Sequence, residues 1–292
     1  MKAWESNIRK VEPYVPGEQP KVQDVIKLNT NENPYGPSEN VRKAMEAIDI
    51  DRCRLYPDPD VTKLVGSIAD YYGMDNNQVF VGVGSDDVLS MCFLTFFNGK
   101  KPVLFPDITY SFYSVWADLY RIPYECQKLD EDFKLVKEDY YKENGGVIFP
   151  NPNAPTGIYE DLSVVEDIIA HNQDVIVIVD EAYIDFAGRS ALELIDKYDN
   201  LIVVQTFSKA RSMAGMRIGY AISNPTLIKY LNDAKYSFNS YTMNQTSIVC
   251  GVEAVKDREY FENGVRKIVE TREWAKEELT KLGFTYLDSG SN

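Results

Sequence analysis

The chain has 292 residues, of which 44% are hydrophobic and 26% charged, enough for one large or two moderate globular domains. This composition excludes collagen-like, low-complexity and disordered chains. Lys and Arg number 31 against 45 Asp and Glu, a formal net charge of −14, so neither nucleic acid nor an anionic membrane is an expected partner.

Histidine and cysteine usage excludes further classes of protein. The single histidine, His171, excludes metal sites built from several histidines. The four cysteines are widely spaced, which favours free thiols in a reducing compartment over a disulfide framework or a zinc site. The N-terminal residues lack the apolar segment of a signal peptide, and no apolar run approaches the roughly 20 residues of a membrane helix. We therefore expect a cytoplasmic protein without a metal.

The predicted elements begin after an N-terminal arm. Residues 1–35 are rich in proline and turn residues and predict an extended arm. Apolar residues at helical spacing over 61–72, followed by Gly73, predict the first helix and its C-terminal cap. A buried strand is expected at 79–83, with a helix starting near Ser85. Further β-rich runs, separated in several places by helical patterns such as 162–170, occupy 102–105, 147–149, 175–180, 201–205 and 217–222.

Strands that are apolar on both faces and alternate with helices predict an α/β fold with a mostly parallel sheet covered by helices on both sides. After Asn224 and Pro225 the strand patterns stop. Residues 259–282 predict one long amphipathic helix, and 283–292 predict the first strand of a second, small domain. The predicted divisions are an N-terminal arm (1–35), a large domain (36–250), and a linking helix with the start of a small domain (251–292).

Polar residues follow the strands at the edge where an open α/β sheet binds ligands. Ser85 and Asp86 begin a helix whose free N–H groups suit a phosphate. N-capping by either side chain is the simpler interpretation of these two residues taken alone. The loop 151–157 is rich in turn residues and brings Asn side chains to the same edge, although it could equally be only a loop.

The later strands end in charged residues. Asp180 closes a hydrophobic strand, where a partly desolvated carboxylate needs a cationic partner. Lys209 follows the next strand, with the hydroxyls of Thr206 and Ser208 beside it, and Arg217 opens the strand after that. Each residue alone has a structural explanation. Together they predict an anion-binding α/β enzyme with a Lys–Asp pair in one crevice.

Several motifs occur in a fixed order: G-S-D-D at 84–87, N-P-N-A-P-T-G at 151–157, D-E-A-Y at 180–183, T-F-S-K-A at 206–210 and G-M-R-I-G-Y at 215–220. With them the sequence resembles the pyridoxal-phosphate-dependent aminotransferases of the aspartate aminotransferase fold, also called fold type I. A narrower resemblance, to the histidinol-phosphate aminotransferases, is carried by P-Y-V-P-G at 13–17, L-N-T-N-E-N-P at 28–34 and R-L-Y-P-D at 54–58. It covers nearly the whole chain. It implies amino transfer between L-histidinol phosphate and 2-oxoglutarate in histidine biosynthesis.

The resemblance implies roles for three residues at the reacting end of the cofactor. Lys209 bonds covalently to the aldehyde of pyridoxal phosphate and, once released, carries a proton between the substrate carbon and the cofactor. Asp180 pairs with the pyridine nitrogen and keeps it protonated, and Tyr183 hydrogen-bonds the phenolic oxygen of the ring.

The cofactor phosphate has its own predicted set of ligands by the same resemblance. These are the backbone N–H groups of Ser85 and Asp86, the hydroxyls of Thr206 and Ser208, and the guanidinium of Arg217.

Tyrosines and the arm complete the predicted site. Tyr110 is expected to stack over the cofactor ring, although packing in a core is its alternative. Tyr56 matches the tyrosine that reaches the phosphate from a neighbouring subunit, which implies a homodimer with shared active sites. Tyr14 and Asn31, on the arm, are expected near the substrate, with plain turn chemistry as an equal alternative.

The chain departs from the family pattern in two places. The family has Asn immediately before Pro-Thr-Gly, where this chain has Ala154; we expect Asn153 or Asn151 to take over its contact with the cofactor ring, unless Tyr183 suffices alone. Relatives also continue past residue 292 with arginines that hold the substrate, so we expect a truncated chain. The alternatives are an aromatic amino acid aminotransferase, a decarboxylase of phosphorylated threonine, or a chain that binds cofactor without turnover.

Overall fold

The computed structural model describes residues 2–21 and 25–292, so residues 1 and 22–24 of the predicted arm lie outside the described part. A seven-stranded sheet forms its centre, in the order β1-β7-β6-β5-β4-β2-β3. The strands are β1 (Val79–Gly82), β2 (Val103–Pro106), β3 (Tyr124–Gln127), β4 (Gly146–Pro150), β5 (Val177–Asp180), β6 (Leu201–Thr206) and β7 (Gly219–Ile222).

The sheet is mostly parallel, as predicted. Strands β3, β2, β4, β5 and β6 pair in parallel, whereas β7 runs antiparallel to both of its neighbours, β6 and β1. The parallel strands therefore present their carboxyl ends at one edge, and β7 begins at that edge.

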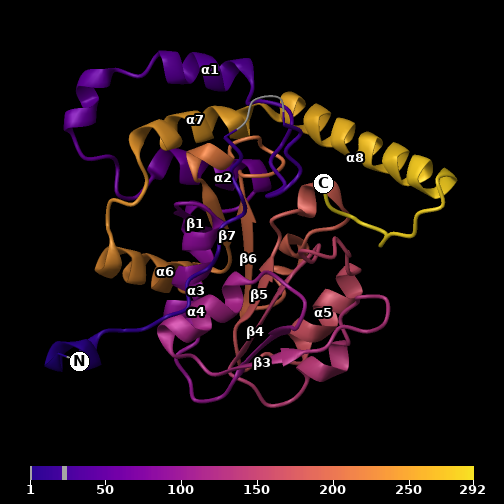
Figure 1. The fold of residues 1–292 in the computed structure, drawn as a ribbon. Helices are drawn as coiled ribbons and strands as arrows, with labels where there is room; N and C mark the ends of the chain where they lie inside the picture. The colour runs from indigo at the N-terminus through magenta and orange to yellow at the C-terminus, as the bar shows by residue number, and fades with distance from the viewer. Residues whose placement is uncertain (1, 22–24) are drawn as a thin grey trace.

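Helices cover both faces of the sheet, because successive strand residues point to opposite sides. Val177 and Val179 pack into one core cluster, while Ile178 packs into the other. The first cluster includes residues of α2 (Thr62–Tyr72), α5 (Leu162–Ala170) and α7 (Gln245–Lys256). The second includes residues of α3 (Ser85–Phe96), α4 (Phe112–Tyr120) and α6 (Pro225–Phe238). Figure 1 shows the strands in the middle of the molecule, with α3, α4 and α6 on one side and α5 on the other.

The remaining helices lie outside these layers. Helix α1 (Glu39–Glu46) packs on α7, and α8 (Arg258–Lys281) is the long helix predicted at 259–282. The predicted domain boundary at residue 250 falls inside α7, so the chain has no break at that point. No helix in the described part of the chain combines the length and apolar character needed to span a lipid bilayer.

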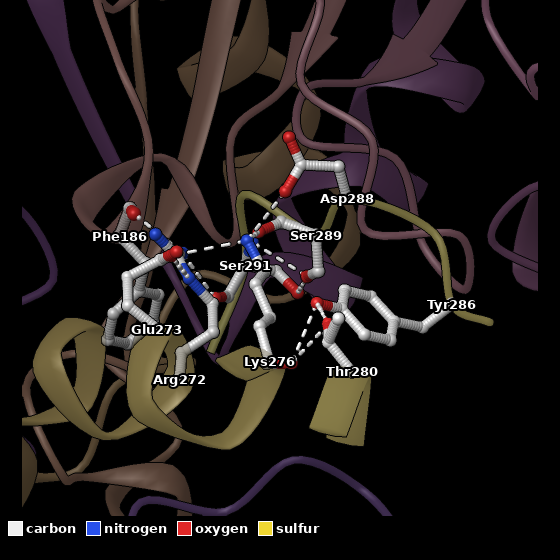
Figure 2. A network of polar contacts seen from close by, with 9 residues as sticks. All are labelled: Phe186, Arg272, Glu273, Lys276, Thr280, Tyr286, Asp288, Ser289 and Ser291. Carbon is white, nitrogen blue, oxygen red and sulfur yellow. Dashed lines mark hydrogen bonds and ion pairs between the residues drawn. The ribbon is translucent and has the colours of Figure 1, made fainter. Parts of the chain in front are cut away.

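The strand predicted at 283–292 is wrong, because this segment is irregular. It turns back along α8, and side chains of that helix bind its backbone in place of a neighbouring strand. Arg272 donates to the carbonyl of Ser291 (2.7 Å), and Lys276 donates to the carbonyl of Ser289 (2.9 Å). Figure 2 shows these contacts, together with the ion pair between Lys276 and Asp288.

Candidate active site

A cavity of about 490 Å³ opens at the carboxyl edge of the sheet, above β5 and β6 and beside the start of α3. The N-terminal arm forms one of its walls. Its lining comprises Tyr14, Pro16, Gly17, Gln19, Thr30, Glu32, Ser85, Asp86, Tyr110, Phe112, Pro150, Ala154, Asp180, Ala182, Tyr183, Thr206, Ser208, Lys209, Ala214, Gly215 and Arg217. Most of the predicted site residues are therefore brought together here. The exceptions are Asn31, Tyr56 and Asn153.

Asp180 lies at the end of β5 and is only 4% exposed. Burial raises the pKa of its carboxyl to about 6, although two donors counteract this by stabilising the anion. They are the hydroxyl of Tyr113, at 2.9 Å, and the backbone N–H of Ala182, at 3.2 Å. A buried carboxylate poised in this way is suited to bind a cationic ring nitrogen.

Tyr113 is a site residue that the sequence analysis missed. It is fully buried in α4, and its hydroxyl donates to Asp180 from beneath the cavity. In the sequence it stands among Phe112, Trp116 and Tyr110, a pattern typical of a core helix, so only its contact with Asp180 distinguishes it.

Lys209 reaches the cavity from the loop between β6 and β7. Its Nζ donates to the backbone carbonyl of Thr30 on the arm, at 2.6 Å, and lies 5.4 Å from the centre of the Tyr183 ring. Burial lowers the pKa of this amine, which favours the neutral, nucleophilic form. The amine and the Asp180 carboxylate line the same cavity, as the Lys–Asp pair predicted from the sequence requires.

Tyr183 links this end of the cavity to the arm. Its hydroxyl accepts a hydrogen bond from Asn31 Nδ2, at 3.0 Å, which explains why Asn31 lies behind the lining. Asn33 fixes the arm further by donating to the carbonyl of Lys209, at 3.0 Å. The ring of Tyr14 stacks on Phe112 with centroids 4.1 Å apart. The arm is thus anchored to both sides of the cavity.

The other end of the cavity has the properties of an anion site. Gly84 is the N-cap of α3, and in the described structure no side chain caps this helix, so the alternative of N-capping by Ser85 or Asp86 is wrong. The carboxylate of Asp86 instead accepts from the Tyr110 hydroxyl (2.7 Å) and pairs with Arg217 Nη2 (3.1 Å). The first N–H groups of α3 and the Arg217 guanidinium therefore converge on one region.

Hydroxyl groups and glycines complete this region. Ser208 accepts from the Thr206 hydroxyl at 3.0 Å, and both line the cavity. Gly84 has a φ of +88°, and a Cβ there would overlap the Arg217 guanidinium. A Cβ at Gly219 would overlap the backbone of Ser85. Glycine thus permits the close approach of β7 to the start of α3.

The loop 151–157 differs from the prediction. The amide of Asn153 donates to the carbonyl of Ile108 (2.9 Å) and to the Thr156 hydroxyl (3.0 Å), and its oxygen accepts from Thr109. These bonds hold the loop in place and keep Asn153 behind the cavity wall, which Ala154 forms instead.

Asn151 is likewise occupied. Its side chain exchanges two hydrogen bonds with the backbone of Glu160, at 2.9 and 3.0 Å. The structure therefore brings neither asparagine to the place where the family pattern has one.

Tyr56 lies on the surface, outside the cavity lining. Its side chain is 82% exposed and packs on Tyr241 with centroids 4.7 Å apart. It is free to contact another subunit, and its predicted role there stays a prediction.

The residues present fit pyridoxal phosphate. An amine and a buried carboxylate line the cavity, and the region of the α3 N-terminus, Arg217 and the two hydroxyls in the same lining suits a phosphate. Tyr110 and Tyr183 provide aromatic side chains in the same lining.

Comparisons with known proteins agree with this arrangement. The family model for class I and II aminotransferases matches residues 23–292. Among curated proteins, the histidinol-phosphate aminotransferase of Lactococcus lactis subsp. cremoris (strain SK11) is 50% identical over 290 residues, which cover 99% of this chain and 82% of that protein. The enzyme of the same name from Clostridium botulinum (strain Hall) is 51% identical over 291 residues, covering 100% of this chain and 82% of that protein.

Solved structures support the same fold. The histidinol-phosphate aminotransferase of Sinorhizobium meliloti, determined in complex with pyridoxal-5'-phosphate, has a TM-score of 0.81 at 24% identity and covers 90% of this chain and 73% of that one. The histidinol-phosphate aminotransferase of Clostridium acetobutylicum has a TM-score of 0.82 at 24% identity and covers 90% of this chain and 80% of that one. The motifs, the cavity and these matches together lead to one conclusion: the chain belongs to the class I and II aminotransferases and, within them, to the histidinol-phosphate aminotransferases.

Proposed function

We propose that this chain transfers an amino group between L-histidinol phosphate and 2-oxoglutarate by a ping-pong mechanism, with pyridoxal phosphate as its cofactor. The observation that carries the proposal is that the Lys209 amine and the buried Asp180 carboxylate line one cavity, beside a region built for a phosphate. When bound, pyridoxal phosphate supplies an aldehyde that takes up the amino group and a ring that accepts electrons.

Asp180 and Lys209 divide the proton chemistry. The Asp180 carboxylate holds a proton on the ring nitrogen, because two hydrogen-bond donors stabilise its anion. The Lys209 amine takes a proton from the substrate carbon and returns it, since burial favours its neutral form. Tyr183 hydrogen-bonds the phenolic oxygen of the ring, and its own hydroxyl is oriented by Asn31.

The remaining cavity residues hold and orient the ligands. The N–H groups of Ser85 and Asp86, the hydroxyls of Thr206 and Ser208, and Arg217 bind the cofactor phosphate. Tyr110 packs against the ring. Tyr14 lines the cavity from the arm and contacts the substrate, whereas Asn31 lies behind the lining and acts on the site through its hydrogen bond to the Tyr183 hydroxyl.

We further propose a homodimer with shared active sites, in which Tyr56 reaches the partner's cofactor phosphate. Large apolar side chains are exposed beside Tyr56, where Leu55 is 49% and Tyr241 is 46% exposed, and near Tyr241 in sequence, where Phe238 at the end of α6 is 69% exposed. Exposed apolar side chains concentrated in this way are typical of protein interfaces. A second copy of the chain would bury them and place Tyr56 against a neighbouring cavity.

Absorbance spectroscopy tests the proposal directly. Purified protein loaded with pyridoxal phosphate should absorb in the visible range, and L-histidinol phosphate should remove that absorbance, whereas 2-oxoglutarate should restore it. Lys209→Ala should keep the fold but lose covalent attachment of the cofactor, as measured by mass spectrometry after borohydride reduction. Lys197→Ala, which changes an exposed lysine on the opposite edge of the sheet, is the matched control.

Other outcomes would replace the proposal. A spectral change with aromatic amino acids but not with histidinol phosphate would indicate an aromatic aminotransferase. Release of carbon dioxide from phosphorylated threonine would indicate a decarboxylase. Bound cofactor without a change on any amine would indicate a chain that binds without turnover.

A further inference from the structure

A buried polar network lies directly behind the strands that carry the ligand-facing residues. The cavity lining includes Asp180 and Thr206, but their neighbours in sequence, Glu181 and Gln205, lie outside it. Both neighbours are almost completely buried, Glu181 at 1% and Gln205 at 4% exposure. The alternation of side chains along a strand explains this arrangement, because adjacent residues point to opposite sides.

Glu181 holds three structural elements together through its carboxylate. One oxygen accepts from the backbone N–H of Ala191, at 2.6 Å. The other accepts from the Ser190 hydroxyl, at 2.6 Å, and from the side-chain amide of Gln205, at 2.8 Å. Ser190 and Ala191 begin the short helix η6 (Ala191–Leu194), so the carboxylate ties η6 and β6 to the end of β5.

Gln205 continues the network across the sheet. Its side-chain oxygen accepts from the hydroxyls of Tyr72 and Tyr220, both at 2.6 Å. Tyr220 lies on β7 opposite Gln205, and Tyr72 is the last residue of α2. A continuous set of hydrogen bonds thus crosses β5, β6 and β7. Its members Glu181 and Gln205 are the sequence neighbours of the cavity residues Asp180 and Thr206.

In its ionised form, the Glu181 carboxylate fixes the direction of every hydrogen bond that it makes. An ionised carboxylate only accepts hydrogen bonds, so it forces the Gln205 amide to turn its NH₂ group toward β5 and its oxygen toward the two tyrosines. The three donors to Glu181 are all neutral groups, and burial raises the pKa of the carboxyl to about 7. The other charged groups near this network are Asp185, which raises the pKa of Glu181 further, and Arg211, which acts on Tyr72 and Tyr220.

A buried carboxylate with neutral partners costs stability relative to an apolar side chain. We propose that Glu181 is a positioning residue for the reaction: by fixing Gln205 and the start of η6, it sets the ends of β5 and β6 and so the places of the Asp180 carboxylate and the Thr206 hydroxyl in the cavity. This inference rests on the proposed function, since those two groups are assigned there to the cofactor.

Glu181→Gln is the sharpest test, because it keeps the shape of the side chain and removes its charge. A glutamine must donate as well as accept, so either the Ala191 N–H loses its acceptor or Gln205 turns over and its oxygen no longer accepts from Tyr72 and Tyr220. Glu193→Gln is the matched control, since Glu193 is an exposed acidic residue on the same short helix η6 and, among the described residues, forms its ion pair with Arg189. Apoprotein of each variant is titrated with pyridoxal phosphate, and the pH dependence of the bound cofactor's visible absorbance is recorded.

Glu181→Gln should bind pyridoxal phosphate about tenfold more weakly and shift the midpoint of the absorbance titration, as expected when supporting residues are displaced. Glu193→Gln should match the wild type in both. Ser190→Ala, which removes one donor to the carboxylate, should give a smaller weakening in the same direction.

A purely structural role would lower the melting temperature of the Glu181→Gln apoprotein and leave affinity and titration midpoint unchanged, which overturns the proposal. If Glu181→Gln does not fold, the Ser190→Ala variant provides the test. Unchanged affinity for pyridoxal phosphate in that variant then overturns the proposal. Failure of the wild type itself to bind pyridoxal phosphate would overturn the proposed function instead.

Discussion

The hydroxyl of Tyr113 donates a hydrogen bond of 2.9 Å to the carboxylate of Asp180, inside the core and beneath the cavity. Tyr113 is fully buried and Asp180 nearly so, which shields the bond from solvent. This bond stabilises the charged carboxylate against the effect of burial, which raises its pKa to about 6.

Tyr113→Phe should therefore raise the pKa of Asp180 further. A hydrogen bond to a charged group contributes about 1.5–3 kcal/mol, so the shift should be about one pH unit or more. Pyridoxal phosphate affinity, measured as a function of pH, should fall at a correspondingly higher pH in the variant. The cofactor phosphate also titrates near pH 6, so the difference between variant and wild type is the quantity to measure.

Tyr140→Phe is the control for that experiment. Tyr140 is equally buried, and its hydroxyl has no hydrogen-bond partner among the described residues. A shift of equal size in both variants would show that the Tyr113 hydroxyl has no particular effect on Asp180.

Asp180→Asn should stabilise the apoprotein at alkaline pH. Because burial raises the folded-state pKa of Asp180 from 3.8 to about 6, its contribution to the free energy of unfolding is greatest below pH 3.8 and is lost as the pH rises through 6. The loss is at most about 3 kcal/mol. Urea unfolding at pH 5 and pH 8 should show a larger gain for the variant at pH 8, and an equal gain at both would contradict this account. The variant should also bind the cofactor weakly.

Gly84→Ala should weaken cofactor binding without unfolding the protein. The new methyl group would displace the Arg217 guanidinium, and the φ of +88° is unfavourable for alanine. We expect at least a tenfold loss of pyridoxal phosphate affinity, in line with about 1.4 kcal/mol or more of lost binding energy. Gly264→Ala, on α8, has open space around it and should bind as the wild type does. Binding by both at wild-type strength would show that Arg217 does not hold the phosphate.

Phe238→Asp should convert the proposed dimer into monomers. The side chain is 69% exposed, so the substitution leaves the monomer intact but introduces a charge into the apolar surface near Tyr241. Sedimentation velocity measures the result. Trp274→Asp, at a 61% exposed position on α8, is the control. A dimer that persists in Phe238→Asp would place the subunit interface elsewhere.

Arg272→Ala should loosen the C-terminal segment. Arg272 donates to the carbonyls of Phe186 (3.0 Å) and Ser291 (2.7 Å) and thus joins α8 to both (Figure 2). Limited proteolysis should cleave within 283–292 faster in this variant. Arg266→Ala, which changes an exposed guanidinium on the same helix, should not increase cleavage, and equal rates in the two variants would count against a specific role for Arg272.

The central strands were predictable because each is an apolar run bounded by turn residues and buried on both faces. Strand β3 was not, since three of its four residues are exposed and its sequence, Tyr-Glu-Cys-Gln, alternates like a surface segment. The segment 283–292 carries β-forming residues, but hydrogen bonding by Arg272 and Lys276 determines its shape. Long-range contacts of this kind leave no local signal.

Long-range contacts also determined which residues of the site could be predicted from the sequence. Lys209, Asp180 and Arg217 stand next to strand ends and were found from that position. Tyr113 and Glu181 act through partners distant in sequence, Asp180 for one and Gln205 for the other. Neither residue type nor spacing distinguishes them from ordinary core residues.

Lys209 and Arg217 both stand on the single connection that leads from β6 into the reversed strand β7. An insertion or deletion between them would change the distance from the Lys209 amine to the Arg217 guanidinium, which binds the cofactor phosphate. The length of this connection therefore sets the separation of the two cations in the cavity. For anyone redesigning substrate preference, the productive place to diversify is the part of the arm from Tyr14 to Gln19, which lines the cavity, whereas Thr30 and Asn33 bind Lys209 and are best kept.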